Sequence, residues 1–112
     1  MTDERRDILP GTLELLVLRT LNLEPMHGWG MAQRIETMSK GVLLVQQGTL
    51  YPALQRMKRR GWVKSEWRQT ANNRRARYYL ITAAGRKQLH KEEEHWRRTS
   101  AAVNGVLGWE EA

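Results

Sequence analysis

Apolar and polar residues alternate with the period of a helix through the first 40 residues of the chain. Residues 11–23 carry apolar side chains on nearly every side, which predicts a largely buried helix that ends before Pro25. Residues 28–40 predict a second helix that stops at Gly41, and the apolar residues 42–45 fit a brief strand or a packed connector. The apolar positions of the second helix are Met31, Ile35 and Met38.

A third, amphipathic helix is predicted to begin at Leu50. Thr49 stands where a helix cap is expected, and Pro52 would then fall in the first turn, where no backbone donor is missed. Gly61 supplies the stop signal. The buried face is expected to consist of Leu50, Ala53, Leu54 and Met57.

The polar face of this third helix carries side chains that can read a base edge or an anion. On a helical wheel Pro52, Gln55 and Arg59 point directly away from the apolar face. Tyr51 and Arg56 flank them. The alternatives are a solvated helix surface for the glutamine and the arginines, and packing of the Tyr51 ring beside Pro52.

Two strands around a polar turn predict a β-hairpin after the third helix. Residues 62–68 alternate between apolar and polar, residues 69–74 are polar, and residues 76–81 are rich in aromatic and branched side chains. Its tip and shoulders carry Arg74, Arg75 and Arg77.

The last helix is predicted to be long and to form a dimer. Thr82 caps it, and the helical pattern runs at least to Ala102. Leu89, Trp96 and Val103 recur every seven residues, which is a narrow seam typical of a helix that pairs with another helix. We therefore expect a homodimer through this helix.

The order of these elements predicts a mainly α fold with a small β-hairpin (α+β). Two helices and a turn before a solvent-facing third helix form a helix-turn-helix, and a basic hairpin directly after it makes the winged version. We expect a winged helix-turn-helix DNA-binding domain over residues 9–82 and a C-terminal dimerisation helix over residues 83–107.

Charge is segregated along the chain, and this favours a polyanionic partner. The net charge is +7. Between Lys40 and Lys91 there are 13 basic residues and a single acid, Glu66, whereas acids gather near both ends of the chain. A solvated surface would be served equally well by both signs, so the segregation favours a phosphate-binding surface. The candidate DNA-binding residues are Thr49, Tyr51, Gln55, Arg56, Arg59, Arg74, Arg75 and Arg77.

Composition argues against the other broad classes of function. Cysteine is absent, which excludes disulfides and thiolate chemistry and fits a cytoplasmic protein. No phosphate-binding loop, nucleophile elbow or zinc-protease motif occurs, so we expect no enzyme and no cofactor. His90, Glu94 and His95 could be drawn as a metal site, but a solvated helix surface explains them better. Apolar runs reach only four residues, too few for a membrane span.

Four blocks of this sequence resemble the PadR-type transcriptional regulators, with the similarity covering residues 9–89. The blocks are Pro25–Trp29, Gly48–Leu54, Arg74–Tyr79 and Leu80–Gly85. The resemblance implies a winged-helix homodimer that represses promoters, often until a small molecule binds. It also implies the smaller subfamily, because a single helix follows the hairpin.

Individual positions follow or depart from that family pattern. Tyr51 matches the family's tyrosine at the start of the recognition helix, which is a usual DNA contact. Trp29 stands where the family usually has tyrosine, and Gly30 where it often has glutamate. Both departures lie on the second helix, away from the recognition helix.

Trp96 is the candidate for contact with an effector. Small members of the family bind drugs at the dimer centre with aromatic residues of this helix, so the resemblance implies a small aromatic or hydrophobic effector near Trp96. Packing of this tryptophan in the dimer seam is the alternative. Two other functions stay open: an RNA-binding winged helix in which Trp62 and Trp67 stack on bases, and a protein-interaction module without a ligand.

Overall fold

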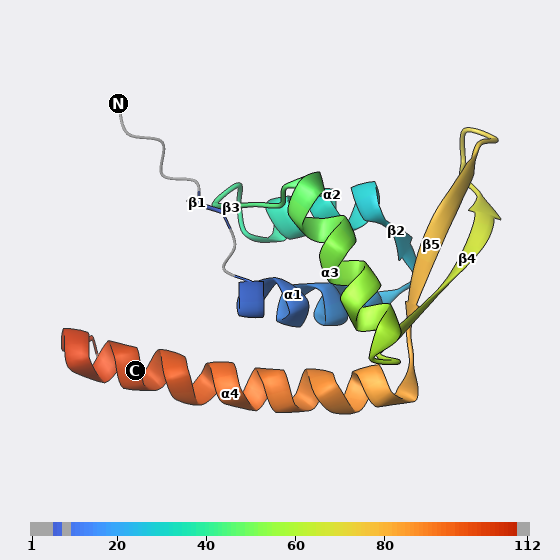
Figure 1. Ribbon diagram of the computed structural model, residues 1–112. Coiled ribbons are helices and arrows are strands. Elements are labelled where there is room, and N and C mark those ends of the chain that lie inside the picture. The colour runs from blue at the N-terminus through green and yellow to red at the C-terminus, as the bar shows by residue number, and fades with distance from the viewer. Residues whose placement is uncertain (1–5, 8–9, 110–112) are drawn as a thin grey trace.

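Residues 6–7 and 10–109, which a computed structural model describes, form helices packed on one face of a small sheet (Figure 1). Strands β2, β4 and β5 make an antiparallel sheet in the order β2-β5-β4, and β1 pairs in parallel with β3. The helices are α1 (Pro10–Leu23), α2 (Gly28–Met38), α3 (Gln47–Arg59) and α4 (Ala83–Leu107). The strands are β1 (Arg6–Asp7), β2 (Met26–His27), β3 (Leu43–Leu44), β4 (Val63–Gln69) and β5 (Arg75–Ile81). This is the α+β winged-helix arrangement that the sequence predicts. Residue 9, the predicted start of the DNA-binding domain, lies outside the described residues.

Helix α1 lies at the centre of the core, as its apolar pattern predicts. Val17 and Leu18 are fully buried, and α1 contacts α2, α3, α4 and β5. The predicted inner face of α3 is buried along its whole length. Only one of the two adjacent tyrosines of β5 joins the core, since Tyr79 is buried and Tyr78 lies on the other face of the strand.

Helix α2 begins at a histidine cap and ends earlier than predicted. The Nδ1 atom of His27 accepts a hydrogen bond from the backbone N–H of Gly30 at 3.0 Å, so His27 has the structural role of a cap. The helix ends at Met38 rather than Lys40, because Lys40 takes a positive φ of 57° and turns the chain. Met38 therefore leaves the buried stripe and is 61% exposed.

Helix α3 begins three residues before the predicted start, which corrects the role expected of Thr49. The carbonyl of Gln46 accepts hydrogen bonds from the N–H groups of Thr49 and Leu50, so the first turn closes around Gln46 and Thr49 lies inside the helix. Pro52 consequently lies in the second turn and not in the first. The proline leaves the carbonyl of Gly48 without an intrahelical donor, and water can reach it because both residues are exposed.

Helix α4 is tied to the end of the hairpin by its predicted cap. Thr82 accepts a hydrogen bond from the N–H of Gly85 at 3.0 Å, and its hydroxyl lies 2.6 Å from the carbonyl oxygen of Gly61. A Cβ atom on Gly85 would overlap the carbonyl oxygen of Trp62, so only glycine allows this close approach. From there α4 runs alongside α1 and then beyond it (Figure 1).

Candidate nucleic-acid interface

The outer face of α3, formed by Tyr51, Pro52, Gln55 and Arg59, is exposed to solvent, as the helical wheel predicts. Thr49 is exposed one turn before Pro52. This face presents a guanidinium and an amide, which are the side-chain groups that form paired hydrogen bonds with guanine and adenine edges.

Tyr51 lies at the edge of this outer face and reaches back to α2. Its side chain is in contact with Gly28, because a Cβ atom there would lie only 2.6 Å from the Tyr51 hydroxyl. The residue as a whole is 42% exposed. The aromatic ring thus joins the start of α2 to α3, and the remaining exposed part can meet a ligand.

One arginine of α3 and the arginine that caps its C-terminal end are turned toward α1 instead of outward. The Glu14 carboxylate of α1 lies 3.9 Å from Nε of Arg56 and 3.6 Å from Nη1 of Arg60. The Glu14 side chain is only 14% exposed, so it is more sheltered from solvent than the acids of the other ion pairs, Glu24, Glu66 and Glu94. No acid among the described residues pairs with Arg59. Sequence patterning did not find this link, since a single glutamate in an apolar helix gave no sign of its partners.

The wing, formed by β4, β5 and the turn 70–74, carries the predicted arginines at its tip. Arg74 lies in the turn beside Asn73, whose positive φ of 61° reverses the chain. Arg75 and Arg77 lie on β5, opposite Gln69 and Trp67 of β4. Trp67 is 56% exposed and has both guanidinium groups close to its ring.

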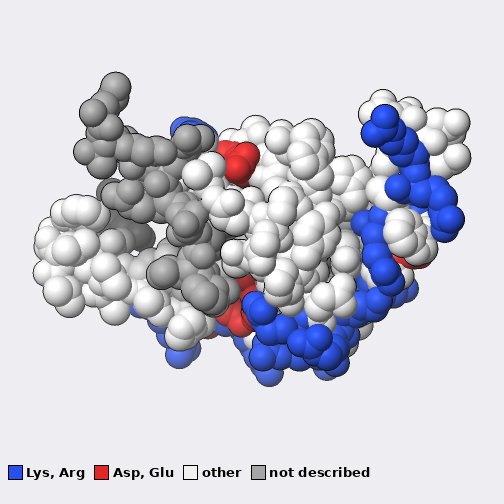
Figure 2. All heavy atoms as spheres, turned by 45° about the horizontal axis from the view of Figure 1, so that its top comes forward, with Lys and Arg blue, Asp and Glu red and all other residues white. Residues whose placement is uncertain are grey.

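Basic side chains cover the end of α3 and continue along the wing. Figure 2 shows lysine and arginine atoms in a band from the lower part of this view up the hairpin at its right, with few acidic atoms among them. Helix α3 and the wing follow each other closely in the chain, since only residues 60–62 lie between α3 and β4. Their basic side chains therefore lie next to one another and form one surface (Figure 2). Such a surface suits the closely spaced phosphates of a nucleic acid.

The structure corrects one residue of the predicted seam on α4. Leu89 is 2% exposed and belongs to the core of its own chain, so it is not available to a second subunit. The physical reason is that α4 packs against α1 and its buried residues, Gly85 and Leu89, lie in its first turns, while its last turns extend past α1 (Figure 1). Trp96 and Val103 are each 50% exposed. The predicted seam did not include three further exposed apolar residues, which are Val106 and Leu107 in the last turn of α4 and Trp109 just after the helix ends.

A hollow of about 380 Å³ lies between α4 and the start of α1, next to Trp96. Thr12 and Leu15 form its α1 side, and His95, Trp96 and Thr99 lie on its α4 side. Its lining combines an indole and a leucine with polar groups, which is the mixture that small organic ligands meet in proteins.

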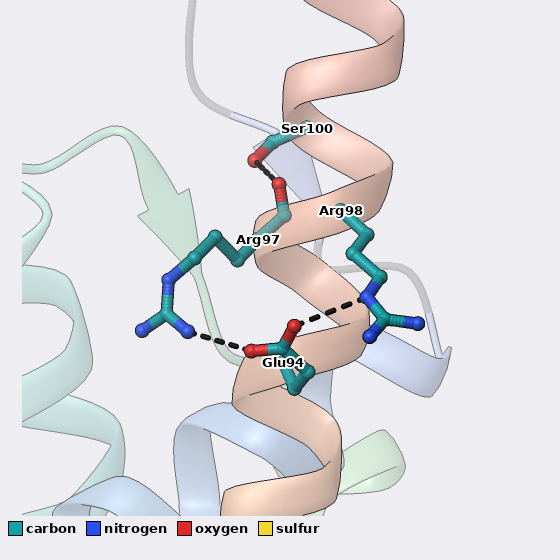
Figure 3. Close-up of polar contacts among 4 residues, drawn as sticks. All are labelled: Glu94, Arg97, Arg98 and Ser100. Atoms are coloured by element: carbon teal, nitrogen blue, oxygen red, sulfur yellow. Dashed lines mark hydrogen bonds and ion pairs between the residues drawn. The ribbon is translucent and has the colours of Figure 1, made fainter.

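Glu94, the last acid of the run 92–94 on α4, is paired with two arginines of the same helix. Glu94 accepts hydrogen bonds from Nη1 of Arg97 at 2.8 Å and from Nε of Arg98 at 3.0 Å (Figure 3). Ser100 donates to the carbonyl of Arg97 at 3.2 Å. In the described part of the chain, no three acids or histidines gather as a metal site would require, and no helix there has the length and apolar character of a membrane span.

Comparison with known proteins gives a family match over most of the chain. A family described as "Transcriptional regulator PadR-like family" matches residues 17–91. A protein of Lysinibacillus sphaericus, called uncharacterized protein X, is 22% identical over 100 residues, which cover 89% of this chain and 92% of that protein.

Solved structures of similar proteins share the fold. A PadR family transcription regulator from Clostridium difficile is 26% identical, with a TM-score of 0.73 over 85% of this chain and 97% of that chain. A PadR-like transcriptional regulator from Bacillus cereus is also 26% identical, with a TM-score of 0.75 over 87% of this chain and 92% of that chain. A Streptococcus mutans protein gives a TM-score of 0.81 at 21% identity, over 96% of this chain and 97% of that chain.

Proposed function

Because this chain belongs to the PadR-like family of transcriptional regulators, which are DNA-binding proteins and not enzymes, we propose that it is a dimeric repressor relieved by a small aromatic effector. We place its DNA-binding unit at residues 9–82 and its dimerisation helix at residues 83–107. The cysteine-free composition suits action in the cytoplasm.

Helix α3 is proposed to enter the major groove with its outer face toward the bases. Gln55 and Arg59 are exposed there and carry the groups that pair with adenine and guanine. Thr49, Tyr51 and Arg56 lie at the margins of this face and would contact backbone phosphates, which fix the position of the helix without reading sequence.

The wing is proposed to contact the backbone beside that groove. Arg74, Arg75 and Arg77 are exposed, and no acid among the described residues forms an ion pair with them. This is the observation that carries the proposal: among the described residues no carboxylate pairs with Arg59 of the outer face or with Arg74, Arg75 and Arg77 of the wing, whereas Arg56, Arg60 and Arg68 have carboxylate partners.

A second copy of the chain is proposed to cover the exposed apolar side chains of α4. Trp96, Val103 and Val106 are exposed on α4, and a helix with such exposed apolar residues is stabilised by pairing. A two-fold dimer would present two α3 helices to half-sites about one helical turn apart, roughly 34 Å.

The effector is proposed to bind beside Trp96. A planar compound could enter the hollow between α1 and α4 and stack on the indole. Since α4 continues directly from the wing through Thr82, a shift of α4 would change the separation of the two recognition helices. The effector would then have different affinities for the DNA-competent and DNA-incompetent dimers, as induction requires.

Titration of the full-length protein against duplex DNA from upstream of its own gene tests this proposal. We expect binding to that duplex to be tighter than to a scrambled duplex, with an affinity that falls steeply as salt is raised. Single-stranded RNA of equal length serves as competitor and tests the alternative RNA-binding function. Absence of salt-dependent duplex binding would instead favour a protein-interaction module.

The Trp96→Ala variant tests the effector site separately. We expect it to lose fluorescence quenching by planar aromatic compounds while the dimer and the DNA affinity stay largely intact, because Val103 and Val106 still pair with the second copy. If the variant dissociates to monomers and no compound quenches the parent protein, Trp96 is interface core alone.

A further inference from the structure

Trp67 has an unusual position for a large aromatic residue, because it is exposed on the wing and surrounded by arginines. It lies on β4, directly opposite Arg77 of β5, and it is 56% exposed. The guanidinium carbon of Arg75 lies 5.2 Å from the centre of its ring, and that of Arg77 lies 5.5 Å away. Both distances are within the range of cation–π attraction.

The two faces of the wing differ in how their arginines are compensated. On the face opposite Trp67, Arg68 forms an ion pair with Glu66 at 2.6 Å and lies over the ring of Tyr78. On the Trp67 face, no carboxylate of the described residues pairs with Arg75 or Arg77. On this face Nε of Arg77 instead donates a hydrogen bond to the Ser65 hydroxyl at 3.0 Å. This face therefore carries two net positive charges side by side.

Two neighbouring guanidinium groups repel each other, and free arginine side chains lose rotamer freedom when they bind an anion. An aromatic ring that both guanidinium groups contact offsets both costs. Its π face attracts each guanidinium, and a side chain already held on the ring has less freedom to lose on binding. The terminal N–H groups stay available for an anionic partner.

We propose that Trp67 is a positioning residue, which holds Arg75 and Arg77 as a preformed pair for the phosphates of the operator. The proposal rests on the DNA-binding function proposed above for the wing. Trp67 acts through the arginines and does not need to touch the DNA.

The strand register places this pair on the same side of the sheet as the recognition helix. Val63, Tyr79 and Ile81 share the strand face of Trp67, since paired residues of antiparallel strands point to the same side and every second residue follows. These three are buried in the core that α1, α2 and α3 also form. Near the base of the wing this face of the hairpin packs on the helices, and near the tip the same face carries Arg75 and Arg77. One DNA duplex can therefore contact α3 and these two arginines together.

A double-mutant cycle on the operator complex tests this role. Trp67→Leu should weaken operator binding by roughly 5- to 30-fold in the otherwise unchanged protein, as expected for the loss of two cation–π contacts. In the background of Arg75→Gln and Arg77→Gln, the same change should cost less than about 2-fold, because the groups it positions are gone. Trp67→Tyr, which keeps an aromatic face, should retain most of the affinity.

The controls separate this inference from the proposed function of the wing. Arg68→Gln removes an arginine that also lies on an aromatic ring but is already paired with Glu66, and it should weaken binding less than Arg75→Gln does. Far-UV circular dichroism and thermal unfolding check that each variant is folded.

Two results would overturn the proposal, and they have different meanings. An equal cost of Trp67→Leu in both backgrounds would show that Trp67 contacts DNA itself or only stabilises the hairpin. Parent-like affinity and salt dependence of the Arg75→Gln/Arg77→Gln protein would show that the wing does not bind the operator at all, which would also remove the proposed function of these arginines.

Discussion

Arg56 and Arg59 lie one turn apart on α3, yet their electrostatic surroundings differ. Arg56 lies beside the sheltered carboxylate of Glu14, whereas Arg59 is exposed and has no acidic partner among the described residues. A guanidinium held by a carboxylate has fewer free donors for a base edge, but it still adds positive charge near the backbone. The two arginines should therefore serve different parts of recognition.

Alanine substitution of each arginine tests this division. Arg59→Ala should reduce discrimination between operator and mismatched duplexes by about 1–3 kcal/mol, the range for a paired contact with guanine. Arg56→Ala should weaken all duplexes alike. Fluorescence anisotropy with matched and mismatched duplexes measures both effects, and an unchanged specificity ratio for Arg59→Ala would remove it from base recognition.

Tyr79 is the residue whose burial makes stability depend on pH. Burial raises the pKa of its hydroxyl above the usual value of 10.0, while nearby Arg77 partly opposes the shift. Because the folded state holds this proton more tightly than the unfolded state, the stabilisation is complete below pH 10 and is lost as pH rises above it.

Tyr79→Phe should therefore unfold with a weaker dependence on pH than the parent protein above pH 10. Urea titrations at pH 8 and at pH 10.5 would measure the difference in the free energy of unfolding. Lysines titrate in the same range, so the comparison is made between the two proteins at each pH. Equal losses in both proteins would show that Tyr79 is not responsible.

At the scale of elements, the junction between the hairpin and α4 depends on one side chain. The Thr82 hydroxyl caps α4 through the N–H of Gly85 and also bonds to the chain at Gly61, just after α3. It therefore links the recognition helix, the wing and α4 at one point. A shift of α4 can reach α3 through this short path.

Thr82→Ala should lower the free energy of unfolding by about 0.5–2 kcal/mol, as expected for the loss of a helix cap. Thr82→Ser keeps the hydroxyl and is the matched control, which should stay close to the parent. Chemical denaturation followed by circular dichroism measures both. If alanine and serine destabilise equally, the hydroxyl is not what holds the junction.

At the scale of the whole molecule, α4 is longer than the core can cover. The buried residues of α4, Gly85 and Leu89, lie in its first turns, whereas Val103 and Val106 near its C-terminal end are 50% and 89% exposed. In a lone subunit the apolar side chains at this end of α4 stay exposed to water, which is unfavourable. A pair of subunits would bury them.

Val106→Glu should therefore shift the protein from dimer to monomer and reduce operator affinity, while each subunit stays folded because this side chain makes no part of the core. Light scattering at micromolar concentration reports the mass. Ala101→Glu, which is exposed on the opposite side of α4, is the control for an added charge. A parent protein that is already monomeric would exclude the dimer.

The sequence by itself determined the elements, their faces and the segregation of charge. Periodicity, caps and turn residues act within a few positions of one another, so the apolar face of α3, the turn of the wing and the cap at Thr82 were readable from short windows. The resemblance to the family added the function that these elements serve.

The tertiary structure alone decided which side chains from distant segments meet. It pairs Glu14 of α1 with Arg56 and places Leu89 in the core of its own chain. It also begins α3 at Gln47, so that Thr49 lies inside the helix. It brings Trp67 beside Arg75 and Arg77 of the wing as well. Such contacts depend on strand register and on how helices pack, and neither is encoded in the spacing of residues within one element.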